Sequence, residues 1–484
     1  MCKEVLVHRK RRYLIFVVFC VVFSINSLGF ADDNRPHFAC GVRTGEVDQT
    51  SAIVWVRLTK EKEARYSKLA IFTEGLKPKD RSSEDMPIDV VPGVKGLVQV
   101  KHWIEGDLSN ARSSEWFQVL PKNDFIHQFQ LSQLIPGKRY EYEVSAKLEA
   151  DSKDANTIKG SFKTAPDKDE GSEVRFIVST CQAIRSIDSG KEGHRAYQQM
   201  LDIDPDFFIH TGDFLYYDKT PFAKNVAAAN AKWNLMFSYG HSRNFLKSVG
   251  SYFIKDDHDT LKNDCWPGQK YGDLTFDQGL KIFRQQVCMG KDTYRTIRWG
   301  KDLQIWMTEN RDFRSPNRKP DGPDKTILGE QQKKWLMKSV HLSDATFRFI
   351  VTPGPIVGPD KKGKNDNHSN PGFTHEGQEL RDFISKQENT YVICGDRHWQ
   401  YCSKDPKTGV LEFGCGPIND EHNFGGTSGR NRKFHRYFGP KGGFLLISVK
   451  GDKATAEWFH ANDPNWVAGQ PPKKLHVEQL PIGK

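Results

Sequence analysis

The chain has 484 residues, of which 37% are hydrophobic and 27% charged, an ordinary balance for a protein of two or three folded domains. Its net charge of +10 is spread along the sequence, with no dense basic stripe interleaved with aromatic residues, which argues against a nucleic-acid partner. Beyond residue 31, no segment is long and apolar enough to predict a membrane span.

Residues 1–31 have the layout of a signal peptide. A basic segment precedes the apolar run 13–23, and Gly29 and Ala31 fit the small residues that precede a cleavage point. The apolar run is shorter than the roughly 20 residues of a transmembrane helix, although an uncleaved anchor is the alternative. We therefore expect export to the periplasm or the extracellular space, by the general secretory or the twin-arginine route.

Residues 37–166 predict an N-terminal all-β domain. Apolar and polar residues alternate over 51–58 and 140–148, and Trp55 and Tyr140 are expected in its core. The pattern resembles a fibronectin type III-like β-sandwich, in which a tyrosine fixes a corner between strands. Residues between Lys60 and Asn123 are expected to hold a long insertion.

Residues 172–460 predict an α/β domain, because apolar strands alternate with helical stretches. The predicted strands are 175–180, 206–213, 251–257, 302–309, 347–355 and 390–396. The predicted helices are 194–203, 274–287, 329–340 and 376–386. Residues 443–460 predict a hairpin with a Gly-Asp turn, and the tail 461–484, rich in Pro and Lys, is expected to be irregular.

Four of the predicted strands end in residue types that can bind metal ions. In an open α/β sheet, ligands bind at the carboxyl ends of the strands. Taken singly, each of these residues is more often part of a turn or of a structural hydrogen bond. If these strand ends meet in the fold, several carboxylates lie close together. Bound cations would then relieve the repulsion between them. The strand ends are Cys181; Asp213 and Tyr216; Asp256, Asp257, His258 and Asp259; and Asp396 and His398.

The order of these motifs resembles the alkaline phosphatase D (PhoD-like) family of metallophosphoesterases. The motifs are Cys-Gln, Gly-Asp-x-x-Tyr, Asp-Asp-His-Asp and Gly-Asp-Arg-His-Trp, and residues 40–58 and 307–316 resemble further family segments, with Glu309 where Asp is usual. Purple acid phosphatases share Gly-Asp-x-x-Tyr but keep Asn-His and His-x-His, so they fit less well. The resemblance implies a four-layer α/β/β/α sandwich, preceded by the fibronectin type III or Ig-like domain, and a hydrolase acting on phosphoric ester bonds.

The resemblance also implies the site residues and the metals. The metal ligands would be Cys181, Asp213, Tyr216, Asp257, Asp366, Asp396 and His398. They would hold ferric iron with calcium, and zinc, manganese or magnesium are alternatives. Two metals would activate a hydroxide for attack on the phosphoryl group. The catalytic residues would be His258, as a proton donor, with Arg311, Arg397 and His368.

Several interpretations of individual residues stay open. Structural pairing with a carboxylate is the alternative for Arg311, Arg314 and Arg397. Asp366 and His368 lie in a polar loop, 358–381, that departs from the family's usual Asp-x-Trp form. Residues 416–423 are a candidate rim loop. Of the nine cysteines, Cys2 and Cys20 precede the cleavage point, and the remaining seven are an odd number, so at least one has no intramolecular partner.

The leading hypothesis is an exported, monomeric hydrolase whose partner is a phosphate-ester substrate, either a phosphomonoester or a phosphodiester. One alternative is a phosphodiesterase or phospholipase D-like enzyme acting on lipid or polymer phosphodiesters. Another is a secreted binding protein with a degenerate catalytic domain. The intact set of candidate ligands argues against that last reading.

Overall fold

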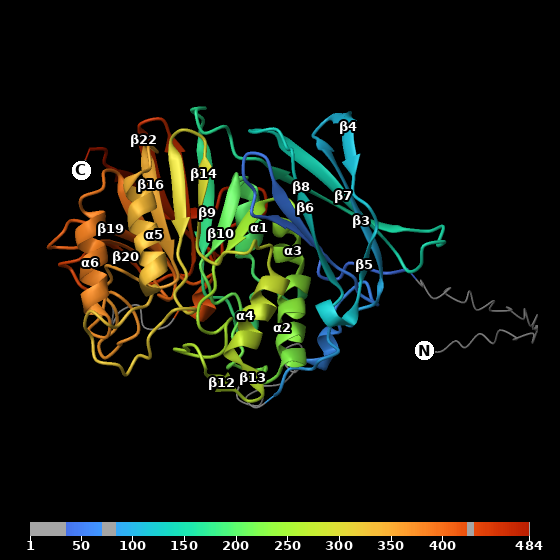
Figure 1. Cartoon of the computed structure of the whole chain (residues 1–484), viewed down its shortest axis with the longest axis horizontal. Coiled ribbons are helices and arrows are strands. Elements are labelled where there is room, and N and C mark those ends of the chain that lie inside the picture. The colour runs from blue at the N-terminus through green and yellow to red at the C-terminus, as the bar shows by residue number, and fades with distance from the viewer. Residues whose placement is uncertain (1–34, 70–83, 424–429, 484) are drawn as a thin grey trace, which may run out of the picture. The chain divides into compact units, whose positions relative to one another are not determined.

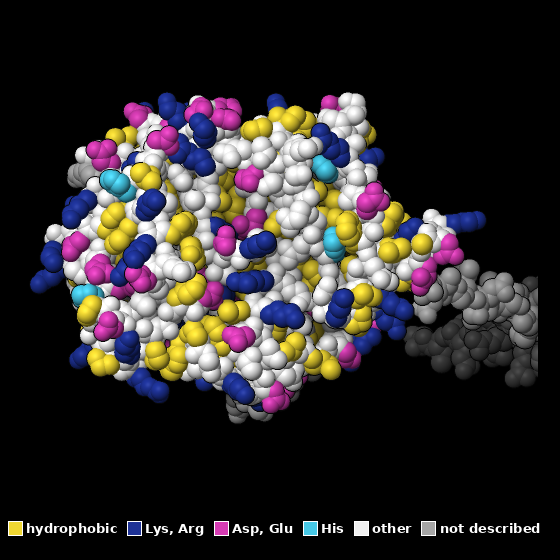
Figure 2. All heavy atoms as spheres, in the orientation of Figure 1, with side chains coloured by type: hydrophobic (Ala, Val, Ile, Leu, Met, Phe, Trp, Pro, Cys, Tyr) yellow, Lys and Arg dark blue, Asp and Glu magenta, His cyan; other side chains and the backbone are white. Residues whose placement is uncertain are grey.

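The computed structural model describes residues 35–69, 84–423 and 430–483 (Figure 1). The predicted signal peptide, residues 1–31, lies outside the described residues. Within those ranges, no helix is long and apolar enough to cross a lipid bilayer. Figure 2 shows Lys and Arg scattered among Asp and Glu over one face, as the dispersed charge of the sequence predicts.

A nine-stranded sheet carries the first three site motifs. Its centre is β9 (Val174–Ser179), β10 (Phe207–His210) and β11 (Gly250–Phe253), which are parallel. Next to β9 lie the predicted hairpin strands β21 (Gly443–Lys450) and β22 (Lys453–His460), and then β23 (Lys473–Leu480). On the other side, β11 pairs with β1 (Val42–Gly45), followed by β2 (Ala52–Arg57) and β6 (Ile126–Leu131). Strands of the two predicted domains therefore share one sheet, and the domain boundaries stay a prediction.

A seven-stranded sheet carries the last motif. Its order is β14 (Arg295–Trp299), β15 (Leu303–Met307), β16 (Phe347–Thr352), β17 (Thr390–Cys394), β19 (Leu411–Cys415), β18 (Gln400–Lys404) and β20 (His435–Gly439). Strands β15, β16, β17 and β19 are parallel. The carboxyl end of β17 leads directly into Asp396 and His398.

Helices cover the outer faces of both sheets, which confirms the four-layer α/β/β/α sandwich (Figure 1). The nine-stranded sheet packs against α1 (Ala196–Ile203), α2 (Val226–Ser238), α3 (Gly240–Leu246) and α4 (Phe276–Gln286). The seven-stranded sheet packs against α5 (Gly329–His341) and α6 (Thr374–Ile384). Along β9, Phe176 and Val178 face the other sheet and Ile177 faces the helices, because side chains alternate along a strand.

The N-terminal region is a β-sandwich, as predicted. A five-stranded sheet packs on β1, β2 and β6, and it contains β3 (Gly96–Ile104), β4 (Asp107–Ser113), β5 (Phe117–Val119), β7 (Arg139–Lys147) and β8 (Asn156–Lys163). Trp55 and Tyr140 are both buried, and the Tyr140 hydroxyl accepts the N–H of Ile135 at 2.9 Å, as a corner tyrosine does. A long insertion was predicted between Lys60 and Asn123. Within that range, β3, β4 and β5 are instead strands of the sandwich.

Two other expectations differ from the structure. The tail 461–484 is not irregular throughout, because β23 pairs with β22. Strand β23 is a mostly exposed edge strand, so its sequence lacks the apolar alternation that predicts strands. Helices α2 and α3 have no counterpart among the predicted helices. Helix α2 is buried on nearly all sides from Ala228 onward, so it shows no one-sided apolar stripe. A short ribbon, β12 (Lys270–Tyr271) with β13 (Leu274–Thr275), precedes α4.

Candidate metal centre

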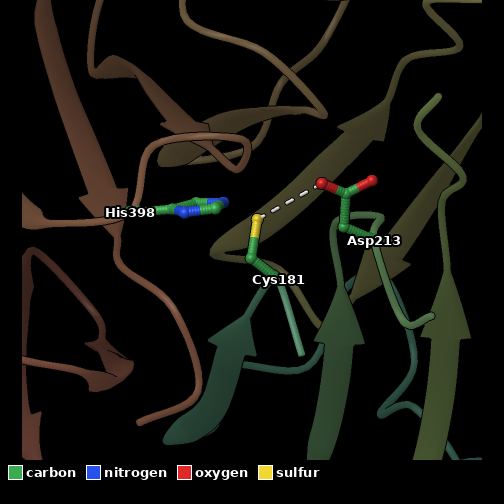
Figure 3. Close-up of side chains that lie close together, drawn as sticks. All are labelled: Cys181, Asp213 and His398. Atoms are coloured by element: carbon green, nitrogen blue, oxygen red, sulfur yellow. Dashed lines mark hydrogen bonds between the residues drawn. The ribbon is translucent and has the colours of Figure 1, made fainter. Parts of the chain in front are cut away.

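The ends of β9, β10, β11 and β17 bring the predicted ligands together. Three groups of side chains each have ligand atoms within 4.8 Å of one another: Cys181, Asp213 and His398; Asp213, Asp257 and His258; and Asp213, Asp256 and Asp396. Asp213 belongs to all three groups. Figure 3 shows Cys181 and His398 approaching Asp213 from different sheets.

Three of these candidate ligands have unusual backbone conformations. Cys181, Asp213 and Asp396 have φ angles of 48°, 57° and 59°, in the left-handed region that non-glycine residues seldom adopt. Such strained residues gather at functional sites. The Gly212 that precedes Asp213 has a φ of 106°, and a Cβ there would lie 2.6 Å from the Cβ of Asp256. The Gly-Asp motif thus permits the close approach of β10 and β11 that the carboxylate cluster needs.

The protein balances the charge of the cluster only in part. Within the described residues, Arg311 pairs with Asp256 and Arg397 with Asp396, whereas no Lys or Arg pairs with Asp213. Burial, with further repulsion from Asp257 and Asp256, raises the pKa of Asp213 well above its usual value. Within the described part of the chain, Asp213 Oδ1 and Asp256 Oδ2 are buried without a hydrogen-bond partner. A buried oxygen left without a partner costs free energy, and a cation would remove both that cost and the repulsion. The donor set therefore fits metal ions.

Thiol and phenol groups complete this side of the site. The Cys181 Sγ donates to Asp213 Oδ2 at 3.6 Å, and the Tyr216 hydroxyl donates to the same oxygen at 3.1 Å. Burial, followed by the charge of Asp213, raises the pKa of Cys181 well above its usual value, so the thiolate form needs a cation beside it. All seven cysteines in the described ranges are buried free thiols, so Cys181 is available as a ligand.

His422 is a site residue that the ligand motifs do not indicate. Its Nε2 lies 2.7 Å from the Tyr216 hydroxyl, and its ring centroid lies 4.6 Å from that of His398. Burial lowers the pKa of His422 to about 3, so the ring is neutral. Because the Tyr216 hydroxyl donates its one proton to Asp213, the N–H of a neutral His422 ring can donate to the Tyr216 oxygen. In the sequence, the only indication of a role for His422 was its position in the candidate rim loop 416–423.

His258 is oriented by Asp218, which was not among the predicted site residues. The His258 Nδ1 lies 2.6 Å from Asp218 Oδ1, and Asp218 Oδ2 accepts the N–H of Asn263 at 2.9 Å. Burial alone would lower the pKa of His258, but Asp257 and Asp218 raise it above its usual value. His258 therefore favours the protonated form that a proton donor needs.

The arginines are paired with carboxylates. Arg311 Nε donates to Asp256 Oδ1 at 2.6 Å, and its Nη2 lies 3.8 Å from Asp257 Oδ2. Arg397 binds both Asp360 and Asp396. Arg314 donates to the carbonyl oxygen of Asp366 and to Asn317. The structural pairing considered for these residues is therefore present, and among them only Arg397 lines the cavity described below.

The structure does not bring His368 and Asp366 into the metal groups. His368 Nε2 lies 2.9 Å from Glu376 Oε2, and both side chains are 1% exposed. Residues 374–381 of the predicted loop belong to α6, and the pair joins the loop before α6 to the first turn of this helix, which is a structural reason for a buried histidine. Asp366 Oδ2 accepts from Lys364 Nζ at 2.8 Å, and its other oxygen accepts from Asn370. We therefore leave His368 out of the proposed catalytic set.

A cavity of about 780 Å³ opens over the cluster. Seven predicted site residues line it: Asp213, Tyr216, Asp257, His258, Asp396, Arg397 and His398. Cavities of this size accommodate small-molecule ligands. The cluster therefore has room for a substrate directly above its carboxylates.

Lys232 of α2 fixes one wall of this cavity from behind. Its buried Nζ donates to the carbonyl oxygens of Tyr216, Lys219 and Pro221, the last two at 2.6 and 2.5 Å. Three carbonyls satisfy the three donors of an ammonium group. The turn that presents Tyr216 and Asp218 is thereby held in one conformation.

Comparisons with known proteins find similar families and similar folds. A family model described as PhoD-like phosphatase matches residues 282–445, and one described as the N-terminal domain of PhoD-like phosphatase matches residues 25–166. A solved structure of PhoD is 15% identical with a TM-score of 0.70, covering 92% of this chain and 90% of its own. Purple acid phosphatase PPD1 from yellow lupin (Lupinus luteus) seeds is 11% identical with a TM-score of 0.62, covering 90% and 73%. Both structures support the fold, and no curated protein sequence matches the chain significantly.

Proposed function

The chain belongs to the PhoD-like phosphatase family, and from this membership we propose that it is an exported enzyme hydrolysing phosphate monoesters and diesters with at least two bound metal ions. Its membership makes it a metal-dependent hydrolase of phosphoric esters. The observation that carries the proposal is the convergence of three ligand groups on Asp213 beneath the cavity.

We assign the ligands by their chemistry. Cys181, Tyr216 and His398 surround one side of Asp213 and offer sulfur, phenolate and imidazole donors, which suit ferric iron. Asp257 and Asp396 offer oxygen donors, which suit a harder cation such as calcium. When bound, such ions polarise the phosphoryl group and lower the pKa of a water molecule.

The protein's own residues bind the substrate and move the proton. With Nδ1 held by Asp218, His258 presents its remaining ring nitrogen as the donor of a proton to the leaving oxygen. Arg397 lines the cavity next to Asp396, where its guanidinium can contact phosphoryl oxygens. Both side chains are buried, and the lower dielectric of a buried site strengthens both interactions.

The size of the cavity favours diesters as well as monoesters. A volume of about 780 Å³ exceeds what one phosphate group occupies, so the cavity can hold organic groups on both sides of a phosphorus atom. The degenerate binding protein is the weaker alternative, because strained backbone and unpartnered carboxylates have a stability cost that only bound metals offset.

The test combines metal analysis with two substrates. Purified chain is analysed for metals by mass spectrometry and assayed with p-nitrophenyl phosphate and bis-p-nitrophenyl phosphate. We expect at least two metals per chain and hydrolysis of both substrates. A protein without metal, or one inactive on both substrates with metals bound, would contradict the proposal. Export is tested separately by the mass of the mature N-terminus, expected near residue 32, and the monomer by light scattering.

A further inference from the structure

Phe222 is an aromatic residue in a cavity lined mostly by polar and charged side chains. It lines the cavity above the metal groups and is partly exposed. The other apolar residues of the lining, Ala183 and Trp399, are only 8% and 0% exposed. Among the described residues, Phe222 is part of no hydrophobic core and no second aromatic ring pairs with it. Its ring is therefore the apolar surface of the lining that a ligand can contact.

The N-terminal region holds the backbone of Phe222 in place. The N–H of Phe222 donates to the carbonyl oxygen of Glu84 at 2.9 Å, and its carbonyl oxygen accepts the N–H of Met86 at 2.8 Å. On the same side, Lys224 Nζ lies 5.1 Å from the centroid of the Phe222 ring and donates to Asp85 Oδ1 at 2.8 Å. A ring on a fixed backbone loses little conformational entropy when a ligand binds to it.

Phe222 and His258 belong to one hydrogen-bonded wall of the cavity. The N–H of Ala223, the next residue, donates to the carbonyl oxygen of Tyr217 at 2.9 Å. The N–H of Tyr217 in turn donates to the carbonyl oxygen of His258 at 3.1 Å, and Asp218 of the same turn lies 2.6 Å from His258 Nδ1. In the proposed reaction, His258 donates a proton to the leaving oxygen. The alcohol that carries this oxygen therefore lies on the wall that contains Phe222.

We propose that Phe222 is a specificity-determining residue that binds an aromatic ring of the leaving alcohol. The proposal rests on the proposed function, because it assumes that the phosphate lies at the metal groups and the leaving oxygen at His258. The substrate class is a phosphate ester of an aromatic alcohol, and the cavity of about 780 Å³ accommodates both the phosphate and the ring. Paired aromatic rings attract each other beyond the area that they bury. No bond within the ring is made or broken, so Phe222 contributes binding only.

The test compares two phosphonates, of which only one carries an aromatic ring. Benzylphosphonate and propylphosphonate are titrated calorimetrically into the full chain with its metals bound, because their C–P bonds are not ester bonds. We expect the wild type to bind benzylphosphonate about tenfold more tightly, and Phe222→Ala to reduce this ratio to about twofold. Phe222→Tyr should retain most of the preference. Phe117→Ala is the matched control, since Phe117 is 41% exposed and does not line the cavity.

Turnover provides a second measurement. With phenyl phosphate as substrate, Phe222→Ala should raise KM about tenfold and leave kcat within about threefold of the wild type, because the ring is bound equally well in the ground state and the transition state. With propyl phosphate, both constants should stay near the wild-type values. A residue that only supports the fold would instead lower kcat for both esters.

Two outcomes would overturn the role of Phe222: no preference for benzylphosphonate in the wild type, or a preference that persists in Phe222→Ala. An equal loss of affinity for both phosphonates leaves the ratio unchanged and belongs to the second outcome. The proposed function fails independently. A wild type that prefers benzylphosphonate but hydrolyses no ester retains the aromatic subsite and loses the proposed reaction, and a wild type that hydrolyses esters without the preference does the opposite.

Discussion

Two buried carboxylates, Asp213 and Glu376, have pKa values shifted in opposite directions. Asp213 is surrounded by other acids, and burial and repulsion raise its pKa. Burial alone would also raise the pKa of Glu376, but His368 and Thr326 hold it at about 2. Glu376 also accepts the backbone N–H of Ile327 at 2.6 Å, whereas Asp213 Oδ1 has no partner among the described residues.

The contrast separates a structural carboxylate from a functional one. A fully partnered carboxylate stabilises the fold and has nothing left to bind. A carboxylate whose charge the protein leaves uncompensated destabilises the fold until a ligand arrives. On this basis we expect the metal groups to be functional and the His368–Glu376 pair to be structural, in contrast to the catalytic role that the sequence resemblance implies for His368.

The largest effect is expected at the shared ligand. Asp213→Asn removes one negative charge from all three groups, so we expect metal loss and a fall in kcat/KM of about 1000-fold or more. Glu376→Gln is the matched control, a buried acid-to-amide change outside the cluster, and it should retain its metals. Metal analysis and a p-nitrophenyl phosphate assay of both variants provide the measurement, and equal losses in the two would remove the distinction.

A smaller effect is expected for the residue that orients His258. Asp218→Asn keeps the shape of the side chain but weakens the 2.6 Å contact with Nδ1, and we expect kcat to fall about 100-fold. Metal content should stay at the wild-type level, because Asp218 belongs to none of the three groups. Loss of metal together with activity would show instead that Asp218 supports the ligands.

The structural pair should affect stability and not turnover. His368→Ala removes one partner of the buried Glu376 and leaves its contacts with Thr326 and Ile327, so the free energy of unfolding should fall by about 2 kcal/mol. The kcat/KM measured well below the melting temperature should change less than about threefold. A large fall in kcat/KM without loss of stability would restore His368 to the catalytic set.

The same pair gives a pH dependence on the acid side. Because the folded-state pKa of Glu376 is depressed to about 2, its stabilisation is present above the unfolded value near 4.5 and is lost as the pH falls towards 2. Denaturant titrations between pH 2 and 5 should show this loss in the wild type and a smaller one in His368→Ala.

Metal removal should reverse the sign of the pH dependence near neutrality. Burial raises the pKa of Asp213 and that of Asp259, the latter to about 8, so the metal-free folded state holds more protons than the unfolded chain. Its stability is therefore greatest below about pH 4 for these groups and falls as the pH rises towards 8. Chelator-treated protein measured at pH 5 and pH 8 tests this, and equal stability at both values would contradict it.

The strand ends could be predicted from the sequence because their geometry is local. A buried parallel strand followed by Gly-Asp delivers its carboxylate to one edge of the sheet, so Asp213 and Asp396 follow from the motif. His422 and Asp218 could not be predicted in this way, because their roles depend on contacts with Tyr216 and His258 that only the folded chain provides. The role of His368 stays a prediction, and its contact with Glu376 of α6 could likewise not be predicted from the sequence. Helix α2 was not predicted, because it is buried on nearly all sides and its sequence shows no amphipathic period.

The most direct test of the metal centre is an anomalous scattering map of metal-loaded crystals. We predict at least two peaks beside Asp213, one of them within bonding distance of Cys181 Sγ and His398. A map with no peak at Asp213, or with its peaks at other residues, would contradict the assignment of this cluster as the metal centre.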